Sequence, residues 1–231
     1  MDNKLNELKL EISKEQVAQL PLATFPGRYV VINNLLDCRK AMKYLMTQKR
    51  LGFDTETRPA FKKGQHFNVA LLQISTDTEC FLFRVKNFGI TEEIVALFEN
   101  PDIMKIGLSV KDDIHQLSAI ARFNPTNIVE LQSFVKQFGI ADNSLQKVYA
   151  IIFGQRISKG QRLTNWEAES LTEAQCAYAS LDAYACLKMF NHLEQGNFNP
   201  SESPYRIEPG SARDDSAESA NCNQSVEAAE S

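Results

Sequence analysis

The chain has 231 residues, of which 43% are hydrophobic and 23% are charged, and its formal net charge at pH 7 is −4. This length and composition fit a single globular domain with a tail. The chain has no apolar run of about eighteen residues, so we expect no membrane span. Its first residues, MDNKLNELKLEISKEQ, are too polar for a secretory signal.

The cysteines indicate a reducing environment. They stand at positions 38, 80, 176, 186 and 222, an odd number without any C-x-x-C spacing. This pattern is typical of reduced thiols that pack in the core of a cytosolic protein. We therefore expect a cytoplasmic location.

Charge is distributed unevenly along the chain. Residues 201–231 hold seven acidic residues against Arg206 and Arg213, a net charge of −5, which leaves residues 1–200 at +1. The segment after Asn199 is also rich in Ser, Ala, Asn and Glu and lacks hydrophobic periodicity. Residues 200–231 are therefore predicted to form a disordered acidic tail. The near-neutral remainder permits nucleic-acid binding but does not by itself predict it.

Hydrophobic periodicity predicts a series of strands and helices before this tail. Residues 1–27 form an N-terminal extension, which packs back on the domain through Val17, Leu20 and Leu22, and residues 28–199 form the domain. Strands are expected at 28–34, 51–56, 68–76, 79–85, 104–108 and from 127. Helices are expected at 35–50, at 90–100, at 143–154 and at 172–194. A further helix is expected to begin near residue 111, and the strand that begins at 127 is expected to pass into a short helix by residue 134. The inward-facing residues of the helix at 35–50 are predicted to be Leu36, Met42, Leu45 and Met46.

The first motif is a pair of carboxylates. Asp54 and Glu56 stand two residues apart in LGFDTET, at the end of an apolar run that predicts a strand. Residues i and i+2 of a strand point to the same face, so both carboxylates enter one small volume and repel each other. A divalent cation such as Mg²⁺, which takes oxygen ligands, would relieve this repulsion. Alone, a D-x-E triplet more often marks a solvated strand end.

The second motif is KIGLSVKDDIHQL, residues 105–117, in which a short strand leads into a helix. Asp113 lies one turn before Leu117, on the flank of the stripe that is predicted to face the core. Asp112 is expected instead to cap the helix or to face solvent. Judged alone, the segment also allows that both aspartates merely favour the helix N-terminus.

The third motif, LTEAQCAYASLDAYACLKMF, predicts a helix that starts with a capping box of Thr172 and Gln175 and runs to about Glu194. Tyr178 and Asp182 are four residues apart and therefore share one face of the helix. An aspartate in this apolar setting is costly unless it is paired or holds a metal ion. A hydrogen bond with Tyr178 or with the backbone is the alternative.

The chain thus contains a strand D-x-E, a helix-start Asp about sixty residues later and a helical Y-x-x-x-D. This order resembles the three exonuclease motifs of the DEDD superfamily, in its tyrosine-bearing subclass. The chain is similar to the branch that contains RNase D and the Werner-syndrome exonuclease. The matching stretches are LGFDTETRP, VALLQIST, KIGLSVKDD and LTNWEAESLTEAQCAYASLDA. Together with strand hairpins followed by strand–helix alternation, the resemblance implies an α/β fold, a ribonuclease H-like mixed β-sheet flanked by helices.

The resemblance implies a 3′–5′ exonuclease that hydrolyses nucleic-acid 3′ ends to nucleoside 5′-monophosphates. Asp54, Glu56, Asp113 and Asp182 would hold two metal ions, Mg²⁺ or Mn²⁺, with Asp54 bridging both and Asp113 serving the second. Tyr178 would orient the attacking water as a neutral phenol. The expected partner is a single-stranded or recessed 3′ end, and the sequence leaves the choice between DNA and RNA open. We expect no membrane and no obligate protein partner.

Two loops beside these motifs are candidate nucleic-acid contacts. They are residues 58–65 and 157–166, and their basic residues are Arg58, Lys62, Lys63, Lys159 and Arg162. Basic groups contact phosphates, but ordinary solvated loop charge is an equal alternative. The only tryptophan, Trp166, could stack on a base, although a Trp beside an amphipathic helix is more often a core residue.

Three other functions fit parts of this pattern. A catalytically idle nucleic-acid-binding module of the same fold would have no reason to keep four mutually repelling acids. A phosphotransferase with an aspartyl nucleophile usually needs D-x-D, where this chain has Glu56. A structural protein with incidental acids does not account for the register of Tyr178 and Asp182 with the other motifs.

Overall fold

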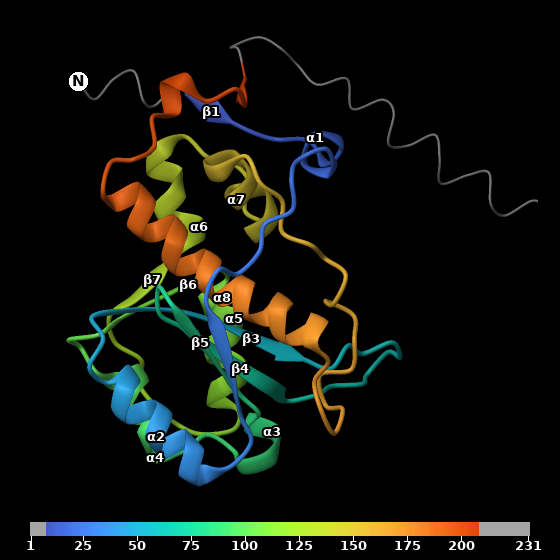
Figure 1. Cartoon of the computed structure of the whole chain (residues 1–231), viewed down its shortest axis with the longest axis vertical. Coiled ribbons are helices and arrows are strands. Elements are labelled where there is room, and N and C mark those ends of the chain that lie inside the picture. The colour runs from blue at the N-terminus through green and yellow to red at the C-terminus, as the bar shows by residue number, and fades with distance from the viewer. Residues whose placement is uncertain (1–7, 208–231) are drawn as a thin grey trace, which may run out of the picture.

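The computed structural model describes residues 8–207, which build a mixed sheet with helices on both faces (Figure 1). The strands of this sheet are β2 (Arg28–Ile32), β3 (Arg50–Thr57), β4 (Val69–Ser75), β5 (Glu79–Phe83), β6 (Met104–Gly107) and β7 (Ile128–Glu130). Their order is β2-β5-β4-β3-β6-β7. β4 runs antiparallel to β3 and β5, whereas the other neighbours are parallel. The predicted mixed sheet is confirmed.

The two faces of the sheet carry separate apolar cores, because strand side chains alternate. On one face β3, β4 and β5 pack against α2 (Leu35–Leu45), α4 (Glu92–Glu99) and α5 (Val110–Ser118). On the other face β4 and β5 pack against α8 (Glu173–Glu194), the long helix that crosses the sheet in Figure 1. Short helices at Val85–Phe88 (α3), Leu131–Phe134 (α6) and Val135–Phe138 (a 3-10 turn) complete the connections.

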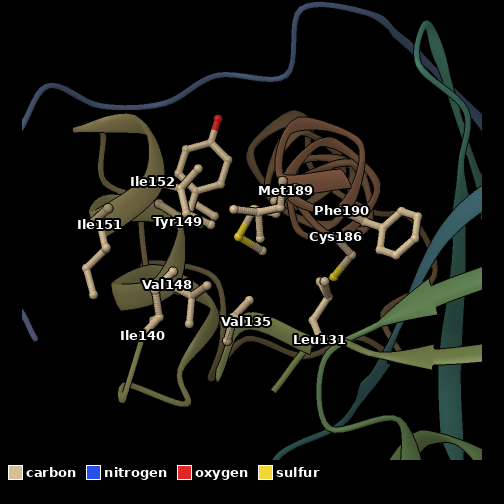
Figure 2. Close-up of a cluster of buried hydrophobic side chains, with 14 of the residues drawn as sticks. Leu131, Val135, Ile140, Val148, Tyr149, Ile151, Ile152, Cys186, Met189 and Phe190 are labelled. Carbon is tan, nitrogen blue, oxygen red and sulfur yellow. The ribbon is translucent and has the colours of Figure 1, made fainter. Parts of the chain in front are cut away.

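Helix α8 forms where the sequence predicts it and is buried on most of its circumference. Its capping box is present: the Gln175 backbone N–H donates to the Thr172 hydroxyl at 3.2 Å, and the Thr172 N–H donates to the Gln175 side chain at 3.0 Å. Beyond the sheet, α8 packs against α7 (Leu145–Phe153), which ends at Gly154 as predicted; Figure 2 shows Met189 and Phe190 of α8 within this cluster.

Close contact between α8 and β3 depends on a glycine. A Cβ atom at Gly52 would lie 2.1 Å from the Ala183 carbonyl oxygen of α8. The absence of a side chain at Gly52 therefore lets the helix backbone settle directly on the strand that carries Asp54 and Glu56.

The first and last described segments pair with each other. β1 (Lys9–Leu10) is antiparallel to β8 (Arg206–Ile207), and a 3-10 turn covers Pro200–Glu202. Residues 200–207 were predicted to belong to the disordered tail, and this prediction is wrong. The 3-10 turn, which Asn199 caps, and the two-residue strand β8 are too short to produce a hydrophobic periodicity in the sequence. The rest of the predicted tail, 208–231, and residues 1–7 lie outside the described residues. α1 (Lys14–Ala18) lies in the N-terminal extension.

Two predictions about side-chain orientation were wrong. In α2, Leu36 and Met46 are 64% and 40% exposed, and the buried stripe consists of Cys38, Ala41, Met42 and Leu45. The helix also ends at Leu45, because Arg50 already belongs to β3. In the extension, Val17 and Leu20 pack against the core as predicted, but Leu22 is half exposed. Within residues 8–207, no helix combines the length and the apolar character that crossing a bilayer requires.

Candidate active site

The two carboxylates of β3 point toward α8. Asp54 and Glu56 pair across the strand with Gln73 and Leu71 of β4. Leu71 belongs to the core beneath α8, so Asp54 and Glu56 share that face, as strand alternation requires. Both acids are half-buried at the end of the sheet. The first motif therefore has the predicted geometry.

Helix α8 brings Tyr178 and Asp182 to the same place. Their side chains are one turn apart and hydrogen-bond to each other. Asp182 is 3% exposed, and its carboxylate groups with those of Asp54 and Glu56, with one oxygen from each lying within 4.8 Å of the others. A strand and a helix separated by more than a hundred residues in sequence thus build one acidic centre.

Asp113 lies beside this group rather than within it. It is buried in α5, whereas Asp112 is exposed, which confirms the predicted orientation of the two side chains. Its Oδ1 accepts a hydrogen bond from the Thr55 hydroxyl at 2.5 Å. Thr55 points to the opposite face of β3 from Asp54, and so Asp113 reaches the centre from the other side of the strand. Its charge is still near enough to raise the pKa of Asp54 and Glu56.

Burial and mutual repulsion hold protons on the acids at this centre. Burial and the charges of the neighbouring carboxylates raise the pKa of Asp54 well above its usual range and that of Glu56 to about 9. Burial raises the pKa of Asp182 to about 7, against the effect of its hydrogen bond with Tyr178. Burial also raises the pKa of Asp113 to about 6, opposed by the Thr55 hydrogen bond. The pKa of the Tyr178 phenol is raised by burial and by the charges of Asp182 and Glu56, so the hydroxyl stays neutral at physiological pH.

These residues fit a divalent cation. All the donors are carboxylate oxygens, the ligands that Mg²⁺ and Mn²⁺ prefer. Asp182 Oδ1 is buried and has no hydrogen-bond partner among residues 8–207. An unpaired buried carboxylate oxygen costs free energy. A cation among Asp54, Glu56 and Asp182 would satisfy that oxygen and remove the repulsion that raises the pKa values.

The acidic centre opens to a cavity of about 500 Å³. Asp54, Glu56, Tyr178 and Asp182 line it together with Arg162, whose positive charge lowers the pKa of Glu56. The start of α7 and the loop before α5 form the opposite wall. The centre is therefore open to a molecule the size of a nucleotide.

The predicted basic residues divide into two groups. Arg162 lines the acidic cavity, and Lys159 lines a neighbouring one. Arg58 pairs with Glu167 at 3.3 Å and stacks over the Phe67 ring. Lys62 and Lys63 are exposed on the loop after β3 and line neither cavity. Trp166 is fully buried against Tyr178, with ring centroids 6.1 Å apart, so it is a core residue.

Glu130 supports the site although it belongs to none of the three motifs. Glu130, at the end of β7, accepts hydrogen bonds from the backbone N–H groups of Ser109 and Val110 at 3.1 and 2.8 Å, and thereby caps α5. Ser109 takes a left-handed conformation with φ of 66°, a strained state for a non-glycine residue at the cavity wall. Only the spatial proximity of β6 and β7 brings this acid to the helix, so local sequence gives no signal for it.

Gln73 is a further residue that sequence reasoning missed. It lies opposite Asp54 in the β3–β4 ladder, is fully buried, and its amide has no hydrogen-bond partner among the described residues. The strand pattern VALLQIS contains the signal, since a Gln within an apolar strand is unusual.

The chain is similar to known proteins in sequence. A family model described as 3′-5′ exonuclease matches residues 29–196. The mouse bifunctional 3′-5′ exonuclease/ATP-dependent helicase WRN is 29% identical over 190 residues, which cover 75% of this chain but 13% of that protein.

Solved structures show the same fold. The Nibbler EXO domain of Aedes aegypti superposes with a TM-score of 0.66 at 19% identity, over 78% of this chain and 96% of that one. RNase D of Trypanosoma brucei, in complex with RNA U12, gives a TM-score of 0.66 at 18% identity, over 73% of this chain and 63% of that one. The predicted ribonuclease H-like architecture is thereby confirmed. Because the family model spans most of the chain and the acidic centre lies inside the match, the chain belongs to the 3′-5′ exonuclease family.

Proposed function

We propose that this protein is a metal-dependent 3′–5′ exonuclease that releases nucleoside 5′-monophosphates from nucleic-acid ends. One observation carries the proposal: three carboxylates from β3 and α8 converge within 4.8 Å, with a neutral tyrosine one helical turn away. Membership of the exonuclease family supports it. The chain spans 13% of the mouse relative, so the activity of the whole relative is not transferred.

Asp54, Glu56 and Asp182 would hold a Mg²⁺ or Mn²⁺ ion, and Asp113 would support a second from the other side of β3. When bound, such ions supply the positive charge that activates water and stabilises the departing 3′ oxygen. The protein contributes a rigid frame: Asp54 and Glu56 are fixed by the ladder with β4, and Asp182 by a buried helix. This rigidity keeps the repelling acids in place before the substrate arrives.

Tyr178 would position the attacking water. Its hydroxyl is neutral, and its ring is held against Trp166. A protonated phenol both donates and accepts hydrogen bonds, so it can orient water without removing the proton itself. Arg162, on the cavity wall, would contact a phosphate of the bound strand.

The proposed substrate is a nucleic acid with a single-stranded or recessed 3′ end. The cavity is lined by an acidic centre, and cations bound there would let a negatively charged phosphodiester enter it. The complex of T. brucei RNase D with RNA U12 supports RNA as one substrate to test. DNA of the same sequence is the necessary comparison.

The direct test is a gel assay with matched RNA and DNA oligonucleotides, labelled at either end. We expect a 5′-labelled strand to shorten one nucleotide at a time, with loss of all activity in EDTA and recovery in Mg²⁺ or Mn²⁺. Asp54→Ala should abolish cleavage, and Asp112→Asn, at an exposed neighbour of the site, should retain it. Cleavage that persists in EDTA would contradict the proposal, and oligonucleotide binding without cleavage would indicate the idle module instead.

We also propose a cytoplasmic location. The cysteines of the described region, Cys38, Cys80, Cys176 and Cys186, are buried and free of disulfides, as a reducing compartment favours. Cell fractionation with the tagged protein tests this, and recovery in an oxidising compartment would contradict it.

A further inference from the structure

A second cavity adjoins the acidic centre. It has a volume of about 580 Å³ and lies between α1, the start of α7 and the segment 156–159. Ser144 and Gln146 line both this cavity and the acidic one, so the two cavities adjoin at the N-terminus of α7. The second cavity is therefore next to the acidic centre on this side.

The charge of this second cavity is opposite to that of the acidic centre. Its charged lining residues are Lys14, Lys147, Arg156, Lys159 and Asp142. Four are cations, contributed by α1, by α7 and by the segment that follows α7, and Asp142 is the one acid among the described residues that line it. The formal net charge of the whole chain is −4. This local gathering of positive charge is therefore not a property of the surface as a whole.

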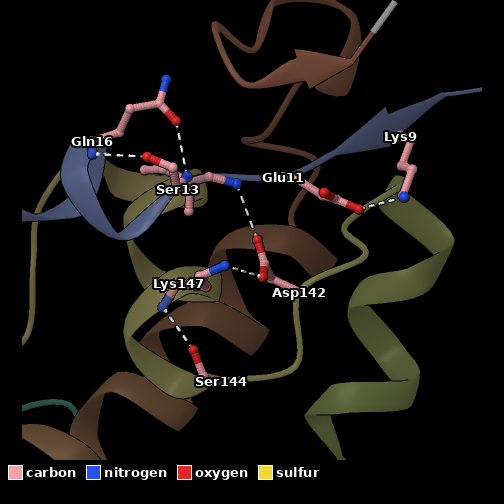
Figure 3. Close-up of polar contacts among 8 residues, drawn as sticks. Lys9, Glu11, Ser13, Gln16, Asp142, Ser144 and Lys147 are labelled. Atoms are coloured by element: carbon pink, nitrogen blue, oxygen red, sulfur yellow. Dashed lines mark hydrogen bonds and ion pairs between the residues drawn. The ribbon is translucent and has the colours of Figure 1, made fainter. Parts of the chain in front are cut away.

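A hydrogen-bond network around Asp142 holds Lys147 and the start of the N-terminal extension in place (Figure 3). Asp142 accepts from the Ile12 backbone N–H at 3.0 Å and from Lys147 Nζ at 2.8 Å. A capping box between Ser13 and Gln16 then starts α1, which carries Lys14. Asp142 thus ties the N-terminal extension, which carries Lys14, to Lys147 of α7, so both lysines line the same cavity.

We propose that this second cavity binds backbone phosphates of the nucleotides upstream of the scissile one in a single-stranded nucleic acid. The inference rests on the proposed exonuclease function, because it assigns the path of that substrate away from the acidic centre. Cations on a fixed frame suit a regularly spaced row of phosphates. Ser144, Ser158 and Gln146 add hydroxyl and amide groups that bind phosphate and sugar oxygens without reading sequence. The N-terminal extension becomes part of the substrate-binding surface.

The test measures binding separately from cleavage. Labelled single strands with phosphorothioate linkages, one a dinucleotide and one of about 12 nucleotides, are titrated with the full chain by fluorescence anisotropy over a range of salt. The variant is Lys14→Gln with Lys147→Gln. The matched control is Lys43→Gln with Lys49→Gln, two exposed lysines that line neither cavity.

We expect the first double variant to raise the Kd for the longer strand about three- to tenfold at low salt. The slope of log Kd against log salt concentration should fall by about 1.4, because each of the two lost phosphate contacts means about 0.7 fewer counterions released. The Kd for the dinucleotide and the Kd values of the control should stay as in the unmodified protein. An unchanged Kd for the longer strand, or an equal loss for the dinucleotide, would overturn the inference.

Lys14→Glu alone keeps the Asp142–Lys147 pair intact and guards against misfolding of the double variant. It should weaken binding of the longer strand at least as much as the lost charge predicts, and an unchanged Kd would again overturn the inference. If the exonuclease proposal itself were wrong, the unmodified protein would still bind the longer strand but would not cleave an oligonucleotide in the gel assay.

Discussion

At the scale of single residues, Tyr178 has the most narrowly defined chemical role. Tyr178→Phe keeps the ring that packs against Trp166 and deletes only the hydroxyl. We expect kcat to fall by about 10²–10⁴-fold, the usual effect of removing a group that handles a proton or orients water. Substrate affinity should change little. Steady-state kinetics measure both quantities.

The matched control for this variant is Tyr149→Phe. That tyrosine is also buried, but its hydroxyl contacts Lys188 at 2.9 Å, away from the acidic cavity. It should retain kcat even if the protein becomes less stable. A near-normal kcat for Tyr178→Phe would make Tyr178 a packing residue.

Asp113 and Asp112 form a natural pair for a second comparison, because they are adjacent and differ in burial. Asp113→Asn should lose most activity, since it removes a charge that acts on Asp54 but keeps an oxygen that can accept from the Thr55 hydroxyl. Asp112→Asn should keep activity. The assay is single-turnover cleavage at saturating Mg²⁺, and restoration of Asp113→Asn by high Mn²⁺ would indicate a metal ligand rather than a structural role.

The raised pKa values of the site predict how stability depends on pH. Without metal, the folded protein holds protons on Glu56 up to a pKa of about 9 and on Asp182 up to about 7, whereas an unfolded chain releases them near pH 4. The folded state therefore binds more protons over this range, and the free energy of unfolding falls as pH rises from about 4 to about 9.

Bound Mg²⁺ needs ionised ligands, so its stabilising effect must grow with pH. Thermal melting in EDTA and in Mg²⁺ at about pH 6 and pH 8 tests both statements. Asp54→Asn should flatten both trends. A larger metal effect at the lower pH would be inconsistent with these carboxylates holding the ion.

At the scale of elements, the contact between β3 and α8 at Gly52 sets the geometry of the site. Gly52→Ala would place a Cβ 2.1 Å from the Ala183 carbonyl oxygen, so the helix must shift. We expect a loss of about 1–3 kcal/mol in stability and a fall in kcat, because Asp182 moves relative to Asp54. Gly160→Ala is the control, since its Cβ would meet only the Ser158 hydroxyl at 3.4 Å. Chemical denaturation and kinetics should separate the two variants.

The elements also show which parts of the structure local sequence could predict. The limits of α8 and its capping box follow from residues within four positions of one another. That Asp54 and Glu56 point to the same face of the sheet follows from strand alternation. The exposure of Leu36 also follows from helical spacing, because Arg39, Lys40 and Lys43 share its face, whereas Cys38, Ala41, Met42 and Leu45 form the apolar stripe. The Glu130 cap of α5 depends on the pairing of β6 with β7. Interactions between distant segments leave no trace in the local sequence pattern, and the Glu130 cap is of this kind, whereas Gln73 stands out within its apolar strand.

At the scale of the whole molecule, the acidic segment after residue 207 should weaken nucleic-acid binding. Residues 208–231 contain six acids and one arginine, a net charge of −5. A chain ending at residue 207 keeps β8 and should bind oligonucleotides more tightly, with a gain that fades as salt rises. Anisotropy at several salt concentrations measures this. Equal affinity of the two chains at low salt would show that the segment does not act through charge.

A chain ending at residue 199 provides the contrasting truncation. It also loses β8 and its pairing with β1, which joins the two ends of the described region. A loss of about 1 kcal/mol would lower Tm by about 2–4 °C in a domain of this size. An unchanged Tm would mean that this pairing contributes nothing to stability.

The position of α8 in the chain governs when the acidic centre comes into being. Ribosomes release the chain from its N-terminus at about 5–20 residues per second, and a domain folds as a unit. Asp54, Glu56 and Asp113 emerge well before Tyr178 and Asp182, so the face of the sheet that α8 later covers stays open in the meantime. An unfinished chain therefore lacks Asp182 and Tyr178 of the proposed nuclease. The proposed nuclease activity therefore requires that nearly all of the domain has been synthesised. Incomplete chains would not cleave nearby nucleic acid.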